Sequence, residues 1–195
     1  MLSFARHIKT HCAKGSPLKS LPIRSSAYMP AKDASHRVKI VSGGQTGVDR
    51  GCLDACLEMG VAYGGWCPRS RRAEDGTIPQ CYLNLRETDS VEYSVRTEQN
   101  VKDSDGTLIF VRSKLFGGTE LTLTLAKRHR KAYYIFDLCG DSPSRHEQIQ
   151  AVTQWIQKHS ISTLNCAGPR ESDCPGIQAE VRAIFSTILV ELGAV

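Results

Sequence analysis

From about residue 38 onward, short apolar runs alternate along the chain with stretches in which apolar residues recur at helical spacing. The apolar runs predict buried strands at residues 38–42, 61–66, 107–111, 132–138 and 163–167. Helical spacing predicts helices that begin near residues 48, 93, 118, 144 and 177, and Ser144 with Glu147 fits a capping box. Alternating strands and helices indicate an α/β protein, a Rossmann-like three-layer sandwich with a mainly parallel sheet.

Residues 67–84 interrupt this alternation with a long polar stretch that contains Pro68 and Pro79. We interpret it as a loop, because it shows neither period and proline interrupts both helices and central strands.

The net charge of +5 is distributed unevenly along the 195 residues. Residues 1–32 hold six of the 25 basic residues and no acidic ones, which leaves 19 basic against all 20 acidic residues, a net charge of −1, for the rest. We therefore divide the chain into a basic leader, residues 1–36, and one ligand-binding domain, residues 37–195. The leader is basic, rich in serine and amphipathic as a helix, which is typical of an organelle transit peptide. The alternative is a disordered tail or an over-long start. The compartment would be mitochondrial or chloroplast in the first case and cytoplasmic in the second.

Several classes of function are disfavoured by composition. A domain with a net charge near −1 lacks the basic footprint of a nucleic-acid binder. No apolar run approaches the ~18 residues of a spanning helix, so we expect no membrane insertion. The eight cysteines form no C-x-x-C pair and no zinc-ligand spacing. We expect reduced thiols and no structural metal, with a thiolate-ligand role for Cys67 as the alternative.

Four predicted strand ends carry unusual sequence, and ligands of parallel sheets bind at such ends. The first is the turn after residue 42, where Gly43, Gly44, Gln45 and Thr46 precede a helix. Glycines allow a close backbone approach, and a helix start offers free N–H groups to an anion. This turn predicts an anion site, with an ordinary tight turn as the alternative.

The second strand end leads into three arginines, Arg69, Arg71 and Arg72. Guanidinium groups bind phosphate or oxyanion oxygens in a bidentate manner. The neighbouring Glu74 and Asp75 offer the alternative that the arginines are neutralised within a solvated loop.

The remaining two strand ends add a second glycine pair and another arginine. Gly117, Gly118 and Thr119 precede one helix, and Arg170 follows the last predicted strand. A polar cluster that includes Arg96 and Asp103 precedes the strand at 107–111. Taken together, these loops predict one pocket for a small anionic ligand. None of the histidines lies on a glycine loop, so a nucleophilic triad finds little support.

The combination of these motifs resembles the molybdenum-cofactor carrier proteins of the circularly permuted YpsA branch of the SLOG superfamily. The matching stretches are SGGQTGVDRGCLDA (42–55), GGWCPRSRRAEDGTIP (64–79), YSVRTEQNVKDSDGTLIF (93–110), GGTELT (117–122) and LNCAGPRESDCPGI (164–177). The resemblance implies a Rossmann-like fold and a homo-oligomer, a dimer or a tetramer. It also implies an anionic ligand, either molybdenum cofactor (molybdopterin) or a molybdate-like oxyanion, and a molybdoenzyme or a cofactor-biosynthesis protein as a partner.

The leading hypothesis from the sequence is a carrier that stores and protects its ligand. The alternatives come from related SLOG proteins: a nucleotide-processing enzyme similar to nucleoside monophosphate phosphoribohydrolases, or a nucleotide-sensing module. The hydrolase signature P-G-G-x-G-T-x-x-E is incomplete around Gly117 and Gly118, so its catalytic glutamate cannot be assigned to Glu120. Enzymatic activity is therefore disfavoured without being excluded.

Overall fold

A computed structural model describes residues 38–112, 114–140 and 143–194. Its main sheet has six strands in the order β5-β2-β1-β8-β6-β7. The strands are β1 (Lys39–Val41), β2 (Tyr63–Cys67), β5 (Leu85–Glu87), β6 (Gly106–Val111), β7 (Ala132–Asp137) and β8 (Thr163–Ala167). Every neighbouring pair is parallel, which confirms the predicted sheet.

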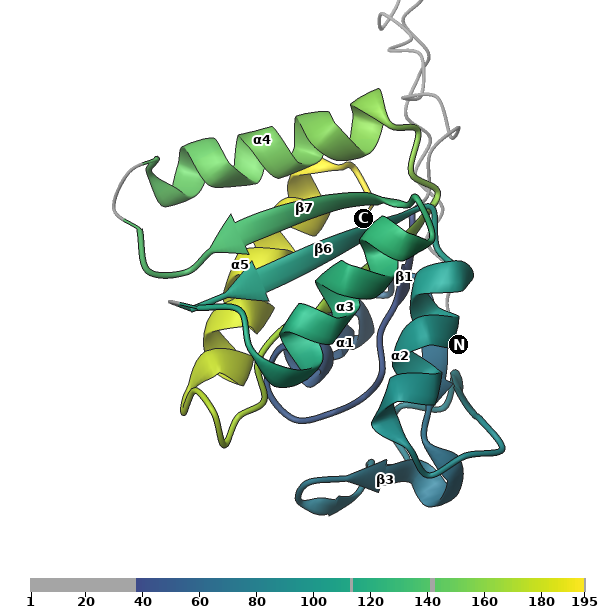
Figure 1. Ribbon diagram of the computed structural model, residues 1–195. Coiled ribbons are helices and arrows are strands. Elements are labelled where there is room, and N and C mark those ends of the chain that lie inside the picture. Colours follow the sequence, from purple (N-terminus) through teal and green to yellow (C-terminus); the bar gives the residue numbers. More distant parts are fainter. Residues whose placement is uncertain (1–37, 113, 141–142, 195) are drawn as a thin grey trace, which may run out of the picture. The chain divides into compact units, whose positions relative to one another are not determined.

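Five helices cover the two faces of this sheet. They are α1 (Val48–Met59), α2 (Tyr93–Lys102), α3 (Gly117–Arg128), α4 (Arg145–Lys158) and α5 (Ile177–Glu191). Helices α1 and α4 both pack against α5 on one face, and α2 packs against α3 on the other. Figure 1 shows α2 and α3 in front of the strands and α5 behind them. The arrangement is the predicted Rossmann-like three-layer sandwich.

The long stretch expected to be a loop contains more structure than the sequence indicated. A single turn of 3₁₀ helix (Arg69–Arg71) leads into a hairpin of β3 (Arg72–Ala73) and β4 (Gly76–Thr77). Directly after the stretch, β5 adds a sixth strand beside β2. These elements are two or three residues long, too short for a hydrophobic period to reveal them.

The largest part of the core lies between the sheet and the face formed by α1, α4 and α5. Ile40, Leu108 and Phe110 of the strands are fully buried there. Helices α1 and α5 approach closely at Gly51. A β-carbon at this position would lie only 2.7 Å from the carbonyl oxygen of Gln178, so the contact requires glycine. Helix α4 begins with the predicted capping box, in which Ser144 and Glu147 satisfy each other's backbone N–H groups.

The cysteines that the structure describes are free thiols. Burial raises the pKa of Cys52, Cys56 and Cys67, so these side chains favour the neutral thiol. Within the described ranges, no helix combines the length and the apolar character that crossing a bilayer requires. The predicted basic leader lies outside the described residues.

The connections of β6 and β8 place a crevice at one end of the sheet. Strand β6 leads into α3 on one face, whereas its neighbour β8 leads into α5 on the other. Two adjacent parallel strands whose helices diverge in this way form a topological switch point, where α/β proteins bind ligands beyond the carboxyl ends of the strands. Three of the four predicted anion loops, those that follow β1, β6 and β8, line a cavity at this point.

Candidate functional site

A cavity of about 270 Å³ opens at the switch point. It lies among the β1–α1 turn, helix α2, the start of α3 and the loop that follows β8. Its lining residues are Gln45, Asp49, Tyr93, Arg96, Thr97, Phe116, Gly117, Gly118, Thr119, Leu121, Thr122, Ala167, Gly168, Pro169, Arg170 and Asp173. Four segments that are far apart in the sequence thus contribute to one site.

Gln45 is the most buried polar group of the β1–α1 turn that lines the cavity, with 4% of its surface exposed. Its side-chain Oε1 accepts hydrogen bonds from the backbone N–H groups of Thr46, at 3.1 Å, and of Glu74, at 2.9 Å. Its Nε2 has no partner among the described residues. A buried amide nitrogen without an acceptor is costly, so this atom is suited to a ligand oxygen.

Arg96 of α2 places a second unpartnered donor at the same cavity. Its Nη1 donates to Asp49 at 3.1 Å, and its side chain is 13% exposed. Its Nε is buried and has no partner in the part of the chain that the structure describes. The guanidinium lies directly over Gly43, where a β-carbon would be 1.7 Å from Nη1. Any larger residue at position 43 would therefore displace Arg96.

The first turn of α3 faces the cavity without a capping side chain. Phe116 precedes the helix and provides no side-chain hydrogen bond to it. The first N–H groups of an α-helix, here at Gly117 and Gly118, have no acceptor within the helix, and the helix dipole makes this end attractive to anions. A β-carbon at Gly118 would meet no atom within 4 Å, so the absence of a side chain keeps this wall open.

Two further arginines gather around the ring of Tyr93. The guanidinium of Arg72 lies 5.3 Å from the ring centroid and that of Arg170 lies 5.0 Å from it. Cation–π contacts of this kind hold an arginine in place while its outer N–H groups remain available. Arg170 lines the cavity directly, and Arg72 supports it through the shared ring.

The turn between β3 and β4 forms hydrogen bonds and an ion pair with the loops around the cavity. Asp75 forms a bidentate ion pair with Arg50, at 2.6 and 2.8 Å. Glu74 accepts hydrogen bonds from the Ser172 backbone and hydroxyl and from the Thr46 hydroxyl. Burial works against the charge of Glu74, but these bonds outweigh it and lower the pKa of the carboxyl below its ordinary value.

Glu74 and Asp75 therefore do not neutralise the neighbouring run of three arginines, which was the alternative interpretation of this loop. Its ionic partners are Arg50 and Arg170, from outside the arginine run. Within the run, Arg71 donates to the backbone carbonyls of Ile78, Pro79 and Tyr82 and so fixes the loop.

The eleven residues proposed from the sequence fall into three groups in the structure. Five line the cavity: Gln45, Gly117, Gly118, Thr119 and Arg170. Four lie in the segments that support it: Gly43, Gly44, Thr46 and Arg72. Arg69 and Arg71 form the 3₁₀ turn and do not line it.

The backbone of the β1–α1 turn is partly engaged within the protein. The N–H of Gln45 donates to Asp49 at 3.2 Å, and that of Thr46 donates to the Gln45 side chain. The carbonyl of Gly44 accepts from Arg50 at 3.1 Å. Among the described residues, the donors without a partner at this cavity are therefore the side chains of Gln45 in this turn and Arg96 in α2, together with the uncapped start of α3.

The sequence analysis assigns no ligand-binding role to several cavity residues: Tyr93, Arg96, Thr97, Phe116 and Asp173. Arg96 had been noted only as part of a polar cluster. The available signal was that α2 is amphipathic but mostly polar, which is unusual for a helix between two strands of a central sheet.

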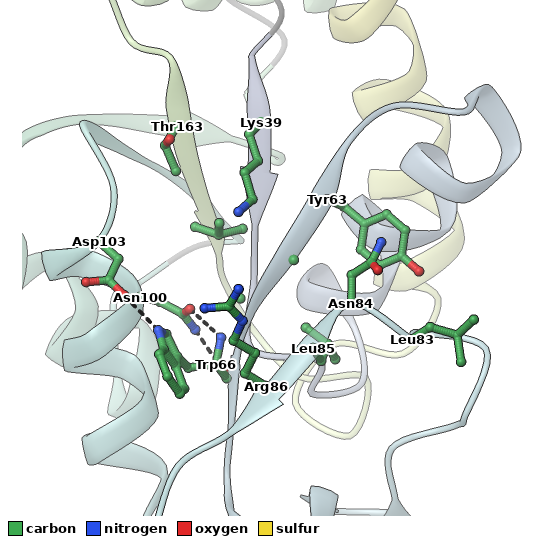
Figure 2. A pocket seen from close by; sticks show the side chains of 13 residues that line it. Lys39, Tyr63, Trp66, Leu83, Asn84, Leu85, Arg86, Asn100, Asp103 and Thr163 are labelled. Atoms are coloured by element: carbon green, nitrogen blue, oxygen red, sulfur yellow. Dashed lines mark hydrogen bonds between the residues drawn. The ribbon is translucent and has the colours of Figure 1, made fainter.

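A wider cavity of about 590 Å³ lies beside the carboxyl-terminal end of α2, where Asn100 and Asp103 line it (Figure 2). Lys39 of β1 and Arg86 of β5 line it, and Trp66 of β2 donates through Nε1 to Asp103 at 2.7 Å. Thr163 and Lys39 mark the beginnings of β8 and β1, so this cavity extends toward the amino ends of the strands. We therefore take the switch-point cavity as the candidate site.

Neither cavity contains an evident metal centre. Across residues 38–112, 114–140 and 143–194, no group of three or more histidine, cysteine, aspartate or glutamate side chains is placed to hold a metal ion. The chemistry of the switch-point cavity is that of N–H donors and positive charge, which suits ligand oxygens.

Comparisons with known proteins agree with this geometry. Residues 40–189 match the sequence model of the circularly permutated YpsA SLOG family. A crystal structure described as "Putative molybdenum carrier protein", from Syntrophus aciditrophicus SB, is 40% identical in sequence with a TM-score of 0.75. The match covers 79% of this chain and 96% of that one. A search of curated proteins gives no match.

Proposed function

The chain belongs to the circularly permuted YpsA SLOG family, and from this membership we propose that its switch-point cavity binds and stores a small oxyanion- or phosphate-bearing ligand. The ligand we favour is molybdenum cofactor, or molybdate as a simpler oxyanion, because the similar crystal structure is named for a molybdenum carrier.

One observation carries this proposal: two residues that line this cavity each hold a buried donor without a partner among the described residues. Gln45 Nε2 and Arg96 Nε lie on different segments, and both belong to residues that line the cavity. Protein interiors rarely leave such atoms unsatisfied. A ligand oxygen that accepts from both would remove the cost of their burial, and phosphate, molybdate and the phosphate of molybdopterin all provide such oxygens.

The surrounding charges favour an anion over a neutral ligand. The uncapped start of α3 faces the cavity at Gly118, and Arg170 lines the opposite loop. Helix termini and guanidinium groups bind oxyanions without a metal, so molybdenum would be held as cargo through its own oxygen atoms or through the phosphate of its cofactor.

Storage is favoured over hydrolysis by the contacts of the buried acidic residue that lines the cavity. Asp49 is 4% exposed, accepts the N–H of Gln45 and pairs with Arg96. Its carboxylate thus joins the β1–α1 turn to α2, which is a structural role. Glu120, the acidic residue of the α3 start, is exposed and does not line the cavity.

The proposal is tested by anoxic incubation of the full chain with molybdate, with extracted molybdenum cofactor and with AMP, followed by gel filtration and elemental analysis. We expect molybdenum to co-elute with the protein. A Gly118→Val variant should lower this binding at least about tenfold, because the new side chain would enter open space in the cavity wall. Thr124→Val, at an exposed position on the same helix, is the matched control.

Three outcomes would contradict the proposal. Equal binding by Gly118→Val and the wild type would place the site elsewhere. Binding of AMP with no molybdenum species bound would favour nucleotide sensing. Release of adenine from AMP would identify a hydrolase.

A further inference from the structure

The wider cavity of about 590 Å³ lies on one face of the sheet, over β1, β2 and β5 (Figure 2). Val41 of β1 pairs with Gly64 of β2. Trp66, two residues further along β2, pairs with Arg86 of β5. Since side chains alternate between the two faces of a sheet, Lys39 joins these residues on the face that lines the cavity. A cavity of this size lies within the range of pockets that hold small molecules.

Gly64 leaves space above β2 for the side chain of Lys39. A β-carbon at position 64 would lie 3.6 Å from Cε and 3.9 Å from Nζ of Lys39. It would also lie 3.3 Å from the carbonyl oxygen of Asn84, which is a tight contact. The ammonium group of Lys39 therefore lies over the backbone of β2, and any larger side chain at position 64 would compete for this space.

Lys39 and Arg86 bring two positive charges to the cavity. Figure 2 shows their side chains extending toward one another from β1 and β5. Among the described residues, neither side chain forms an ion pair or a cation–π contact. The carboxylate of Asp103 in the lining accepts hydrogen bonds from Trp66 and Gln99 instead, at 2.7 and 3.0 Å. Two like charges that converge without a counter-charge repel each other, so this cavity favours an anion.

We propose that the wider cavity is a second ligand site, which binds a phosphorylated sugar with its phosphate between Lys39 and Arg86. A phosphate monoester carries a charge of about −1.5 to −2 at neutral pH and so balances both cations, whereas a carboxylate would balance only one. The guanidinium of Arg86 can bind two phosphate oxygens at once, and the ammonium of Lys39 acts as a point charge beside them.

The rest of the lining suits an organic group that carries hydroxyls. Each oxygen of the Asp103 carboxylate accepts one bond within the protein, and each has a further lone pair for a hydroxyl of the ligand. Asn84, exposed at the cavity, supplies an amide that both donates and accepts. Trp66 adds the apolar surface of its indole ring. A bare phosphate would leave these groups without contact, whereas a sugar phosphate uses them together with the two charges.

The second site is separate from the switch-point cavity and does not rest on the function proposed for that cavity. The two cavities share no lining residue. Helix α2 contributes to both, through Arg96 to the switch-point cavity and through Asn100 to the wider one. Variants of Lys39 and Arg86 therefore test the second site without altering the first.

Calorimetric titration of the full chain with glucose 6-phosphate, inorganic phosphate and glucose tests the proposal. We expect glucose 6-phosphate to bind most tightly of the three, and its affinity to fall as the salt concentration rises. Lys39→Gln and Arg86→Gln should each raise the dissociation constant of glucose 6-phosphate at least about fivefold, because each removes a charge-assisted contact with the phosphate. Lys39→Arg keeps the charge and should retain most of the wild-type affinity.

The matched controls remove exposed charges that lie outside the cavity. Lys158→Gln and Arg128→Gln should bind glucose 6-phosphate like the wild type. Gly118→Val alters the switch-point cavity and should retain the binding that Lys39→Gln weakens. Urea unfolding checks that each variant is folded.

Four outcomes would overturn the proposal. Glucose 6-phosphate may fail to bind the wild type, or it may bind both glutamine variants as tightly as the wild type. A loss confined to Gly118→Val would assign the sugar phosphate to the switch-point cavity. Inorganic phosphate that binds as tightly as glucose 6-phosphate would show that the sugar makes no contact.

Discussion

The side-chain oxygen of Gln45 accepts the backbone N–H of Glu74 at 2.9 Å, across 29 positions of sequence. This bond and the second one from the Thr46 N–H fix which end of the amide is the oxygen. The Nε2 group must then face away from both donors. Gln45 therefore anchors the β3–β4 hairpin, and in the proposed function its Nε2 is the group that donates to the ligand.

The anchoring role predicts a loss of stability in Gln45→Leu. This variant leaves the buried N–H groups of Thr46 and Glu74 without an acceptor, and each unsatisfied donor costs about 1–3 kcal/mol. We expect the free energy of unfolding in urea to fall by at least about 2 kcal/mol. Gln154→Leu, at an exposed position on α4, should change it little. Equal effects would show that the two hydrogen bonds of Gln45 are not needed.

The ion pair of Arg50 with Asp75 predicts that a positive charge alone at position 50 does not maintain the stability of the fold. The Arg50 side chain is 7% exposed and donates to both oxygens of Asp75 and to the Gly44 carbonyl. Lysine keeps the charge but cannot make this set of bonds. Arg50→Lys should lower the free energy of unfolding by about 1–3 kcal/mol.

The matched control for Arg50→Lys is Arg182→Lys. Arg182 pairs with Glu58, but both side chains are about half exposed. Exposed ion pairs contribute little to stability, so the free energy of unfolding of this variant in urea should stay near that of the wild type. A similar decrease in both variants would contradict the special role of the hairpin ion pair.

Glu74 predicts a loss of stability in acid. Its folded-state pKa lies below the unfolded value of about 4.3, so its contribution is complete above that pH. The contribution disappears as the pH falls through the lower, folded-state pKa. Urea unfolding from pH 7 to pH 3 should show this decrease in the wild type and a shallower one in Glu74→Gln. Glu191→Gln, at an exposed position near the end of α5, should retain the wild-type slope.

Tyr93 predicts an effect on ligand binding that depends on its ring and not on its hydroxyl. The ring contacts the guanidinium groups of Arg72 and Arg170. Tyr93→Phe keeps these contacts and should bind molybdate like the wild type. Tyr93→Leu removes them and should weaken binding about three- to tenfold, because a cation–π contact contributes about 0.5–1 kcal/mol at exposed sites and more when desolvated. Isothermal titration of both variants measures the difference, and identical affinities would exclude a role for the ring.

The sequence predicted the fold well because each long element has a clear period. The apolar faces of α1 and α5 and the fully buried β6 are examples, and the switch-point cavity lies where the rule for strand ends expects a pocket. Strand β5 and the β3–β4 hairpin escaped prediction because elements of two or three residues have no measurable period.

The assignment of individual arginines was harder, since it depends on contacts between distant segments. Arg69, Arg71 and Arg72 are neighbours in sequence, yet Arg71 is used to bind backbone carbonyls of its own loop. Arg96 lies over Gly43, 53 positions earlier in the chain. A local motif shows where charge is available, but only the folded chain shows which guanidinium reaches the cavity.

The attachment of α2 to β2 has a practical consequence. Asn100 of α2 binds both the N–H and the carbonyl of Trp66, at 2.7 and 3.0 Å, and the indole Nε1 of Trp66 donates to Asp103 just beyond the helix. The same helix carries Arg96 at the ligand cavity. Trp155 is the only other tryptophan in the chain. A Trp155→Phe protein would therefore contain a single tryptophan, hydrogen-bonded to the end of α2, and its emission on selective excitation would report any displacement of this helix without an added label.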